Sequence, residues 1–295
     1  MKVVVSGTNS IKLAKNIARR INAKFVGIEY KKFPDGESYV RLKENIPKGA
    51  EALIVQTLYP QNDSIVELFF LLDLVSEFKP KNISLIIPYF AYARQHKRYR
   101  KWEAISSKTF AKLLQNFNIE RIFTIDLHSN DLIKFFDLEV VHLSTTELIA
   151  KYFLRKNLKN PFVLIPDQER EWMAKKAAKI LNCDYSYLKK YRSRVTGEIK
   201  TEIFKDFDLR GKDVILMDDI ISTGKTMINA IEIVKRKEAK NIFVSCVHYI
   251  PSEVYKEMLN LGAKEVISTN TIQSKVSKID VAPLIVDSLK SIWKK

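Results

Sequence analysis

The chain has 295 residues, of which 46% are hydrophobic and 28% charged, and this is the composition of a globular protein long enough for two domains. It shows no signal peptide and no apolar run near the roughly 18 residues of a membrane span, so we expect a cytoplasmic protein. Its cysteines, Cys183 and Cys246, lack metal-site spacing, so we expect them to be thiols in the core. The net charge of +16 is spread along the chain without a zinc-finger, basic-zipper or RNP motif, which favours a solvated surface and anionic substrates, with no nucleic-acid or membrane partner.

The first half of the chain alternates apolar strands with amphipathic helices. Strands are expected at 3–5, 25–28, 38–41, 53–56, 83–87, 122–125 and 140–143, and helices at 10–21, 63–77, 106–116 and 131–136. Because strands that alternate with helices pair in the same direction, this half predicts a mainly parallel α/β sheet.

The second half repeats this plan. Helices are expected at 145–157, 170–181 and 253–261, and strands at 162–165, 184–188, 198–204, 214–217, 242–247 and 265–268. A last amphipathic helix over 283–293 can pack on either half, and we group residues 283–295 with the first. No linker rich in Gly, Pro or Ser separates the halves, so we predict two closely joined domains, 1–143 and 144–282.

The most informative stretch is 214–226, which reads VILMDDIISTGKT. Its first four residues suit a buried parallel strand, and two adjacent carboxylates, Asp218 and Asp219, stand where we expect this strand to end. Carboxylates accept hydrogen bonds from the vicinal hydroxyls of a ribose and also hold hydrated cations. The alternative is that the two acids only terminate the strand.

A turn of small residues, Ser222, Thr223 and Gly224, follows the acids, and a helix is expected from Thr226. Backbone N–H groups in such a turn converge on an anion at a helix N-terminus, which predicts a phosphate site; a plain turn is the alternative. The tripeptide GKT also suggests a P-loop, but Asp219 stands where a P-loop needs its first glycine.

Four other polar stretches each follow or join a predicted strand, where ligands of open parallel sheets bind. They are KFPDGES at 32–38, PYFAYARQHK at 88–97, TIDLHS at 124–129 and IPDQE at 165–169. Phe33 can stack on a planar base, or it can tuck inwards in a hairpin turn. Arg94 and Gln95 suit phosphates and a base edge, with a solvated basic loop as the alternative.

Two of these stretches contain candidate metal ligands. His128 can present an imidazole nitrogen to a metal or phosphate, with Asp126 orienting it, or it can be a structural histidine. Asp167 can hold Mg²⁺, partly through water, or it can cap the helix that follows.

Taken in this order, the motifs FPDGE, YARQHK, DLH, IPD, KKYR and DDIISTGKT resemble those of the ribose-phosphate pyrophosphokinase family. The similarity extends over nearly the whole chain and includes NDSIVELFFLLD at 62–73 and AISSK at 104–108. It implies an α/β fold of two tandem phosphoribosyltransferase-like domains. It also implies Mg²⁺-dependent transfer of the diphosphoryl group of ATP to the 1-hydroxyl of ribose 5-phosphate, which gives 5-phosphoribosyl 1-diphosphate and AMP.

The resemblance further assigns a role to each matching residue. The ATP-binding residues are Phe33, Asp35, Gly36, Glu37, Arg94, Gln95, Lys97 and His128. The ribose-5-phosphate-binding residues are Arg192, Asp218, Asp219, Ser222, Thr223, Gly224, Lys225 and Thr226. The metal-linked residues are His128 and Asp167, and the catalytic cations are Lys190 and Arg192. Because the Phe33 loop would serve a neighbouring subunit, the resemblance implies a homo-oligomer, at least a dimer.

The chain departs from the family pattern at several positions. His96 and Tyr99 stand where many relatives have Asp, residues 168–170 replace a glycine-rich turn, and Lys225 replaces a glycine. Two alternative functions remain open at this point. One is a phosphoribosyltransferase that uses the same sugar loop, and the other is a catalytically impaired regulatory or RNA-binding protein.

Overall fold

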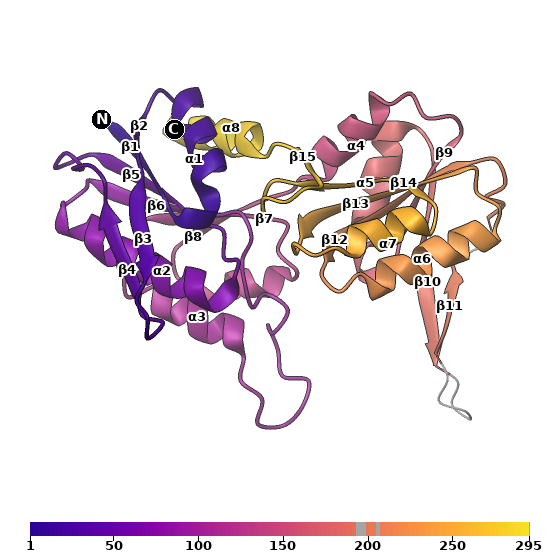
Figure 1. Ribbon diagram of the computed structural model, residues 1–295, viewed down its shortest axis with the longest axis horizontal. Helices are drawn as coiled ribbons and strands as arrows, with labels where there is room; N and C mark the ends of the chain where they lie inside the picture. The colour runs from indigo at the N-terminus through magenta and orange to yellow at the C-terminus, as the bar shows by residue number, and fades with distance from the viewer. Residues whose placement is uncertain (193–198, 205–206, 295) are drawn as a thin grey trace. The chain divides into compact units, whose positions relative to one another are not determined.

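The computed structural model describes residues 1–192, 199–204 and 207–294, with side chains for 1–189, 203–204 and 207–294. The chain divides into two compact units (Figure 1). The first comprises Met1–Ser144, Thr271–Gln273 and Asp280–Lys295, and the second comprises Thr145–Asn270 and Ser274–Ile279. The first unit therefore also contains Ser144 and residues 271–273 and 280–282, which we grouped with the second domain.

The first unit is built on a six-stranded parallel sheet with the strand order β2-β1-β5-β6-β7-β8. The strands are β1 (Lys2–Ser6), β2 (Lys24–Val26), β5 (Glu51–Val55), β6 (Asn82–Ile87), β7 (Arg121–Ile125) and β8 (Glu139–Leu143). Their apolar residues are buried, as in β1 and β5, because helices cover the sheet. A separate antiparallel hairpin joins β3 (Ile28–Lys32) to β4 (Ser38–Leu42).

Four α-helices of the described chain belong to this unit. They are α1 (Ile11–Arg20), α2 (Gln61–Glu77), α3 (Ser106–Leu114) and α8 (Ala282–Trp293). The C-terminal α8 packs against α1 (Figure 1), so the end of the chain returns to the first unit. Short 3-10 turns, η1 (Thr8–Ser10) and η2 (Asn130–Phe135), follow β1 and β7, and η2 replaces the helix predicted at 131–136.

The second unit contains a seven-stranded sheet with the order β11-β10-β9-β12-β13-β14-β15. Its strands are β9 (Pro161–Ile165), β10 (Asp184–Arg192), β11 (Ile199–Ile203), β12 (Asp213–Ile221), β13 (Asn241–Tyr249), β14 (Ala263–Thr269) and β15 (Ser277–Ile279). All pairs are parallel except β10 with β11, a hairpin that extends away from the body of this unit (Figure 1). The pattern missed β15, because three residues are too few to show a period.

Helices α4 (Thr146–Leu154), α5 (Glu171–Leu181), α6 (Lys225–Arg236) and α7 (Val254–Asn260) complete the second unit, with a 3-10 turn, η3 (Gln168–Arg170), before α5. One predicted boundary bears on function. We expected the central strand to end at Met217, but β12 continues to Ile221, which pairs with Tyr249 of β13. The two acids therefore lie inside the strand, because β13 continues to supply backbone hydrogen bonds beside them.

Candidate functional site

The turn between β12 and α6 forms an open helix N-terminus. Gly224 caps α6 with φ +78°, and a Cβ added there would lie 2.4 Å from Cγ2 of Val254, so this position accepts only glycine. Lys225 begins the helix and is exposed. Within the described residues, no side chain accepts a hydrogen bond from the backbone N–H groups of 222–226. These N–H groups and the positive end of the helix dipole make the turn a suitable anion site.

The adjacent acids lie in β12, just before this turn. Asp219 is buried, with 6% of its surface exposed, whereas Asp218 is partly exposed. The backbone N–H of Asp219 donates to Oδ1 of Asp218 at 2.9 Å. Burial, then the adjacent Asp219 carboxylate and more weakly that of Asp167, raise the pKa of Asp218 well above its ordinary value. A cation or a hydroxyl donor nearby would therefore stabilise the charged form of Asp218.

Asp167 follows β9, the neighbour of β12 in the sheet. Its Oδ1 accepts a hydrogen bond from the backbone N–H of Glu169 at 2.9 Å, so Asp167 caps η3. The capping alternative is therefore correct for this oxygen. The Asp167 carboxylate also makes a small contribution to the raised pKa of Asp218 in β12.

Arg170 is a residue of this site that the sequence analysis did not identify. Its Nε and Nη2 lie 3.1 and 2.8 Å from Oδ2 of Asp219, and the two side chains are only 12% and 9% exposed. The sequence offered one signal for it, a charged residue in place of a glycine-rich turn after Asp167. That signal does not reveal the partner, because Arg170 and Asp219 are 49 residues apart.

In the first unit, the predicted base-stacking residue lies at the tip of the β3–β4 hairpin. Phe33 is 42% exposed, and its ring meets Tyr39 edge-on at 6.1 Å, so the inward-facing alternative is wrong. The turn closes through hydrogen bonds from the Phe33 N–H to the Glu37 carbonyl (2.8 Å) and from the Gly36 N–H to the Phe33 carbonyl (2.9 Å). Gly36 takes φ +96°, and Asp35 accepts a hydrogen bond from the Glu37 N–H at 3.2 Å. The hairpin thus presents an aromatic ring beside two acids.

The loop after β6 has a defined shape that Glu103 and Gln95 maintain. The Gln95 amide nitrogen donates to the carbonyls of Lys97 and Ala104, both at 3.3 Å, so this amide is directed into the loop. Arg94 and Lys97 are exposed. Backbone hydrogen bonds from the loop, followed by one from Gln95, lower the pKa of Glu103. The loop therefore presents two cations on a fixed backbone.

His128 lies in the loop after β7, with its ring 6.4 Å from that of His96. A second histidine, which the sequence analysis missed, holds this loop, because Nε2 of His142 accepts a hydrogen bond from the Leu127 N–H at 2.9 Å. Burial lowers the pKa of His142, and Asp126 opposes this shift, so the proposed orienting acid acts on His142. The accepting nitrogen requires a neutral His142 imidazole.

Lys190 and Arg192 lie near the end of β10, opposite Thr201 and Ile199 of β11, and their side chains fall outside the described residues. Among the side chains that are described, no group of three or more His, Cys, Asp or Glu residues is arranged to hold a metal ion. No helix in the described ranges is long and apolar enough to span a membrane.

Comparisons with known proteins cover both halves of the chain. The N-terminal domain of ribose phosphate pyrophosphokinase matches residues 2–117, and the phosphoribosyl transferase domain matches residues 139–282. A ribose-phosphate pyrophosphokinase of Sulfolobus acidocaldarius is 40% identical over 295 residues, 99% of each chain. One of Methanothermobacter thermautotrophicus is 36% identical, covering 98% of this chain and 100% of its own.

A solved structure agrees with these matches. The crystal structure of phosphoribosylpyrophosphate synthetase from Mycobacterium smegmatis is 26% identical, has a TM-score of 0.86, and covers 100% of this chain and 99% of its own. The predicted fold of two phosphoribosyltransferase-like domains and the predicted enzyme class are confirmed. The chain belongs to the ribose-phosphate pyrophosphokinase family.

Proposed function

We propose that this protein transfers the diphosphoryl group of ATP to the 1-hydroxyl of ribose 5-phosphate, giving 5-phosphoribosyl 1-diphosphate and AMP. The observation that carries the proposal is the open turn between β12 and α6, which comes two residues after a pair of adjacent carboxylates in β12. A sugar phosphate needs both features, an anion site for the phosphate and acceptors for the hydroxyls. Similarity to ribose-phosphate pyrophosphokinases over 99% of the chain supports the same activity.

The second unit is the proposed sugar-phosphate domain. The 5-phosphate would bind the N–H groups of 222–226, with the exposed Lys225 adding a positive charge. The ribose hydroxyls would donate hydrogen bonds to Asp218 and Asp219. Because the acids and the turn belong to one strand-to-helix connection, a single rigid element would fix both ends of the sugar.

The first unit is the proposed ATP domain. The exposed Phe33 ring would stack on adenine, with Asp35 and Glu37 accepting from the base or its ribose. Arg94, Gln95 and Lys97 would hold the triphosphate on the fixed loop after β6, with His128 nearby. In this proposal the hairpin serves the site of a neighbouring subunit, so the active form is at least a dimer.

Mg²⁺ is the proposed cofactor, and the acids of the second unit fit it chemically. Burial, and then the carboxylates of Asp219 and Asp167, raise the pKa of Asp218, and a divalent cation beside Asp218 would favour its charged form. Asp167 would hold the ion partly through water, and His128, in the first unit, stays a predicted metal-linked residue. When bound, Mg²⁺ neutralises charge on the transferred phosphates.

Cytoplasmic location and the absence of a nucleic-acid partner stay predictions.

Lys190 and Arg192 are the proposed catalytic cations. Attack on the β-phosphorus builds negative charge on oxygens that are already anionic, so cations placed there stabilise the transition state more than the substrates. Arg192 supplies a planar fork of donors and Lys190 a compact charge. Both residues lie near the end of β10, where this strand pairs with β11.

Release of AMP from ATP and ribose 5-phosphate tests this function. We expect Lys190→Ala and Arg192→Ala each to lower kcat by about a thousandfold or more, with substrate dissociation constants changed little. Lys189→Ala is the matched control, because neighbouring strand residues point to opposite faces, and it should keep most of the activity. An unmodified protein that binds ribose 5-phosphate but forms no AMP would instead be a regulatory relative.

A further inference from the structure

A buried ion pair links the turn after β9 to the acids of β12. Two nitrogens of the Arg170 guanidinium lie 3.1 and 2.8 Å from the same oxygen of Asp219. Both side chains are largely withdrawn from water, with exposed fractions of 12% and 9%. Exposed ion pairs contribute little, but at this depth the loss of one partner leaves a charge that water cannot solvate well. The contact therefore differs from the surface ion pairs of the same unit.

The backbone around Arg170 fixes where its side chain goes. Asp167 caps η3, and the Arg170 N–H donates to the Asp167 carbonyl at 3.0 Å, so the turn is held at two points. Strand β9 pairs in parallel with β12, with Leu164 opposite Leu216, so the residues after β9 lie beside the acids of β12. A turn of glycines at 168–170 would offer no cation here. The residues Gln168–Arg170 supply one.

We propose that Arg170 is a positioning residue of the sugar-phosphate site. It holds Oδ2 of Asp219 in one orientation, so that the other oxygen of Asp219 and the adjacent Asp218 can accept hydrogen bonds from the ribose hydroxyls. The proposal rests on the function proposed above, because it assigns ribose 5-phosphate to this site. Because Arg170 contacts Asp219, it would act on sugar binding through this acid.

The contacts around the acids explain why the pair matters for binding. Asp218 and Asp219 are adjacent in β12, and the backbone N–H of Asp219 donates to Oδ1 of Asp218 at 2.9 Å, so the orientations of the two carboxylates depend on each other. Without the guanidinium, Oδ2 of Asp219 loses the two donors that fix it, so the other oxygen is no longer held in place to accept a hydrogen bond from a sugar hydroxyl. Loss of Arg170 should therefore weaken ribose 5-phosphate binding and leave ATP binding unchanged.

The test compares Arg170→Gln and Arg170→Lys with the matched control Arg210→Gln. Arg210 also contacts an aspartate, Asp208, through Nε and Nη2 at 3.0 and 2.7 Å, but that pair is exposed. Calorimetry of ribose 5-phosphate binding is read together with KM for each substrate and kcat. For Arg170→Gln we expect at least about tenfold weaker sugar-phosphate binding, a matching rise in KM for ribose 5-phosphate, and an unchanged KM for ATP.

The other variants decide between positioning and a purely structural contact. Arg170→Lys keeps the charge but not the planar donors, so its affinity for ribose 5-phosphate should lie between that of the unmodified protein and that of Arg170→Gln. Arg210→Gln should bind like the unmodified protein. The proposal would be overturned if Arg170→Gln melted at a lower temperature but bound ribose 5-phosphate as tightly as the unmodified protein. If Arg170→Gln does not fold, the same result for Arg170→Lys would overturn it. The contact would then be a purely structural ion pair.

The same experiment separates this inference from the proposed reaction. An unmodified protein that binds ribose 5-phosphate without releasing AMP would refute the reaction, and the affinities of the Arg170 variants would still support or overturn the positioning role. An unmodified protein with no affinity for ribose 5-phosphate would overturn both.

Discussion

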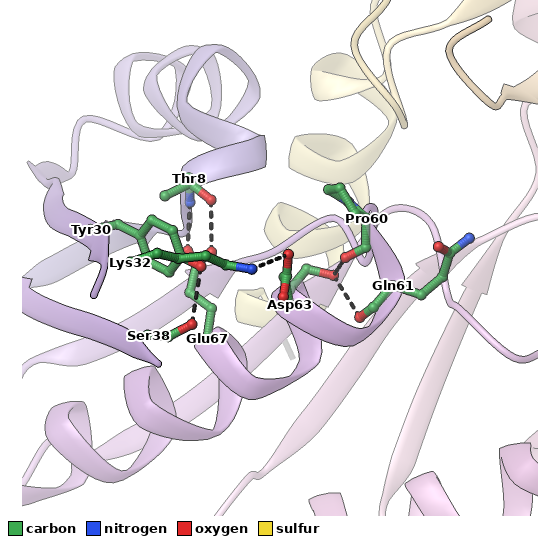
Figure 2. Close-up of polar contacts among 9 residues, drawn as sticks. Thr8, Tyr30, Lys32, Ser38, Pro60, Gln61, Asp63 and Glu67 are labelled. Carbon is green, nitrogen blue, oxygen red and sulfur yellow. Dashed lines mark hydrogen bonds and ion pairs between the residues drawn. The ribbon is translucent and has the colours of Figure 1, made fainter. Parts of the chain in front are cut away.

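The turn after β1 in the first unit and the turn after β12 in the second have the same architecture and opposite chemistry. Each follows a parallel strand and leads into a helical segment. In the first unit, the Thr8 N–H and hydroxyl both donate to the Glu67 carboxylate at 2.7 Å (Figure 2). In the second, no described side chain accepts from the N–H groups of 222–226.

The space around the two glycines shows the same contrast. A Cβ on Gly7 would lie 1.7 Å from Oε1 of Gln56 and 2.9 Å from Oε1 of Glu67, so polar side chains of its own unit fill that turn. The three atoms nearest to a Cβ on Gly224 all belong to the apolar side chains of Val254 and Met258, at 2.4–3.3 Å. A strand-to-helix turn thus becomes an anion site only where the protein leaves its N–H groups without an internal carboxylate.

The largest effect is expected from Gly224→Ala, which breaks the open turn. Left-handed backbone costs a non-glycine residue about 1–2 kcal/mol, and the contact with Val254 adds about 1–3 kcal/mol of overpacking. We expect lower thermal stability and a loss of most ribose 5-phosphate affinity, measured by thermal unfolding and calorimetry.

Gly211→Ala separates the two causes. Gly211 also has a left-handed φ, +70°, but no atom lies within 4 Å of an added Cβ. It should show the backbone cost alone, with sugar-phosphate binding intact. Equal loss of binding in both variants would mean that the geometry of the Gly224 turn is not what binds the phosphate.

A smaller, pH-dependent effect is expected from Glu67→Gln, which alters the closed turn. Burial raises the pKa of Glu67 above its usual 4.5, although hydrogen bonds from Thr8 oppose the shift. As the pH falls through the raised pKa towards 4.5, the folded protein takes up a proton that the unfolded chain binds less tightly. The unfolding free energy of the unmodified protein, relative to that of Glu67→Gln, should therefore increase as the pH is lowered from 8 to about 5.

Urea unfolding of both proteins across this pH range measures the effect. Glu147→Gln supplies the opposite sign, because hydrogen bonding to Lys151 lowers the pKa of Glu147, and the stability that this pair contributes is lost as the pH falls. If the difference in unfolding free energy between the unmodified protein and Glu67→Gln did not change with pH, burial would not raise the pKa of Glu67.

The smallest effect is expected from Lys225→Gln. This variant removes the positive side chain beside the turn and keeps the backbone of the turn, so it separates the two contributions to phosphate binding. An exposed charge near a phosphate contributes about 1 kcal/mol, so affinity for ribose 5-phosphate should fall roughly fivefold and depend less on salt. Lys235→Gln, in the last turn of the same helix, removes the same charge far from the turn and should have no effect. An unchanged salt dependence in Lys225→Gln would show that Lys225 does not face the anion.

The sequence predicted most of this site because the relevant signals are local. The alternation of strands and helices, the small residues at 222–224 and the glycine that alone accepts φ +78° are properties of neighbouring residues. The exposed hairpin tip at Phe33 was predicted as one of two alternatives, and only packing decided that the ring faces outwards. The strand end before Asp218 was predicted wrongly, because the partner strand β13, and not the local pattern, sets where β12 stops.

By itself, the sequence determined the fold class, the family and the turn that would bind a phosphate, since these depend on short motifs and on periodicity. The tertiary structure alone decided which turn is open and which acid is neutralised. Thr8 and Glu67 are 59 residues apart, and Arg170 and Asp219 are 49 apart. Such pairs form because the order of strands in a sheet differs from their order in the chain, and no local pattern encodes that order.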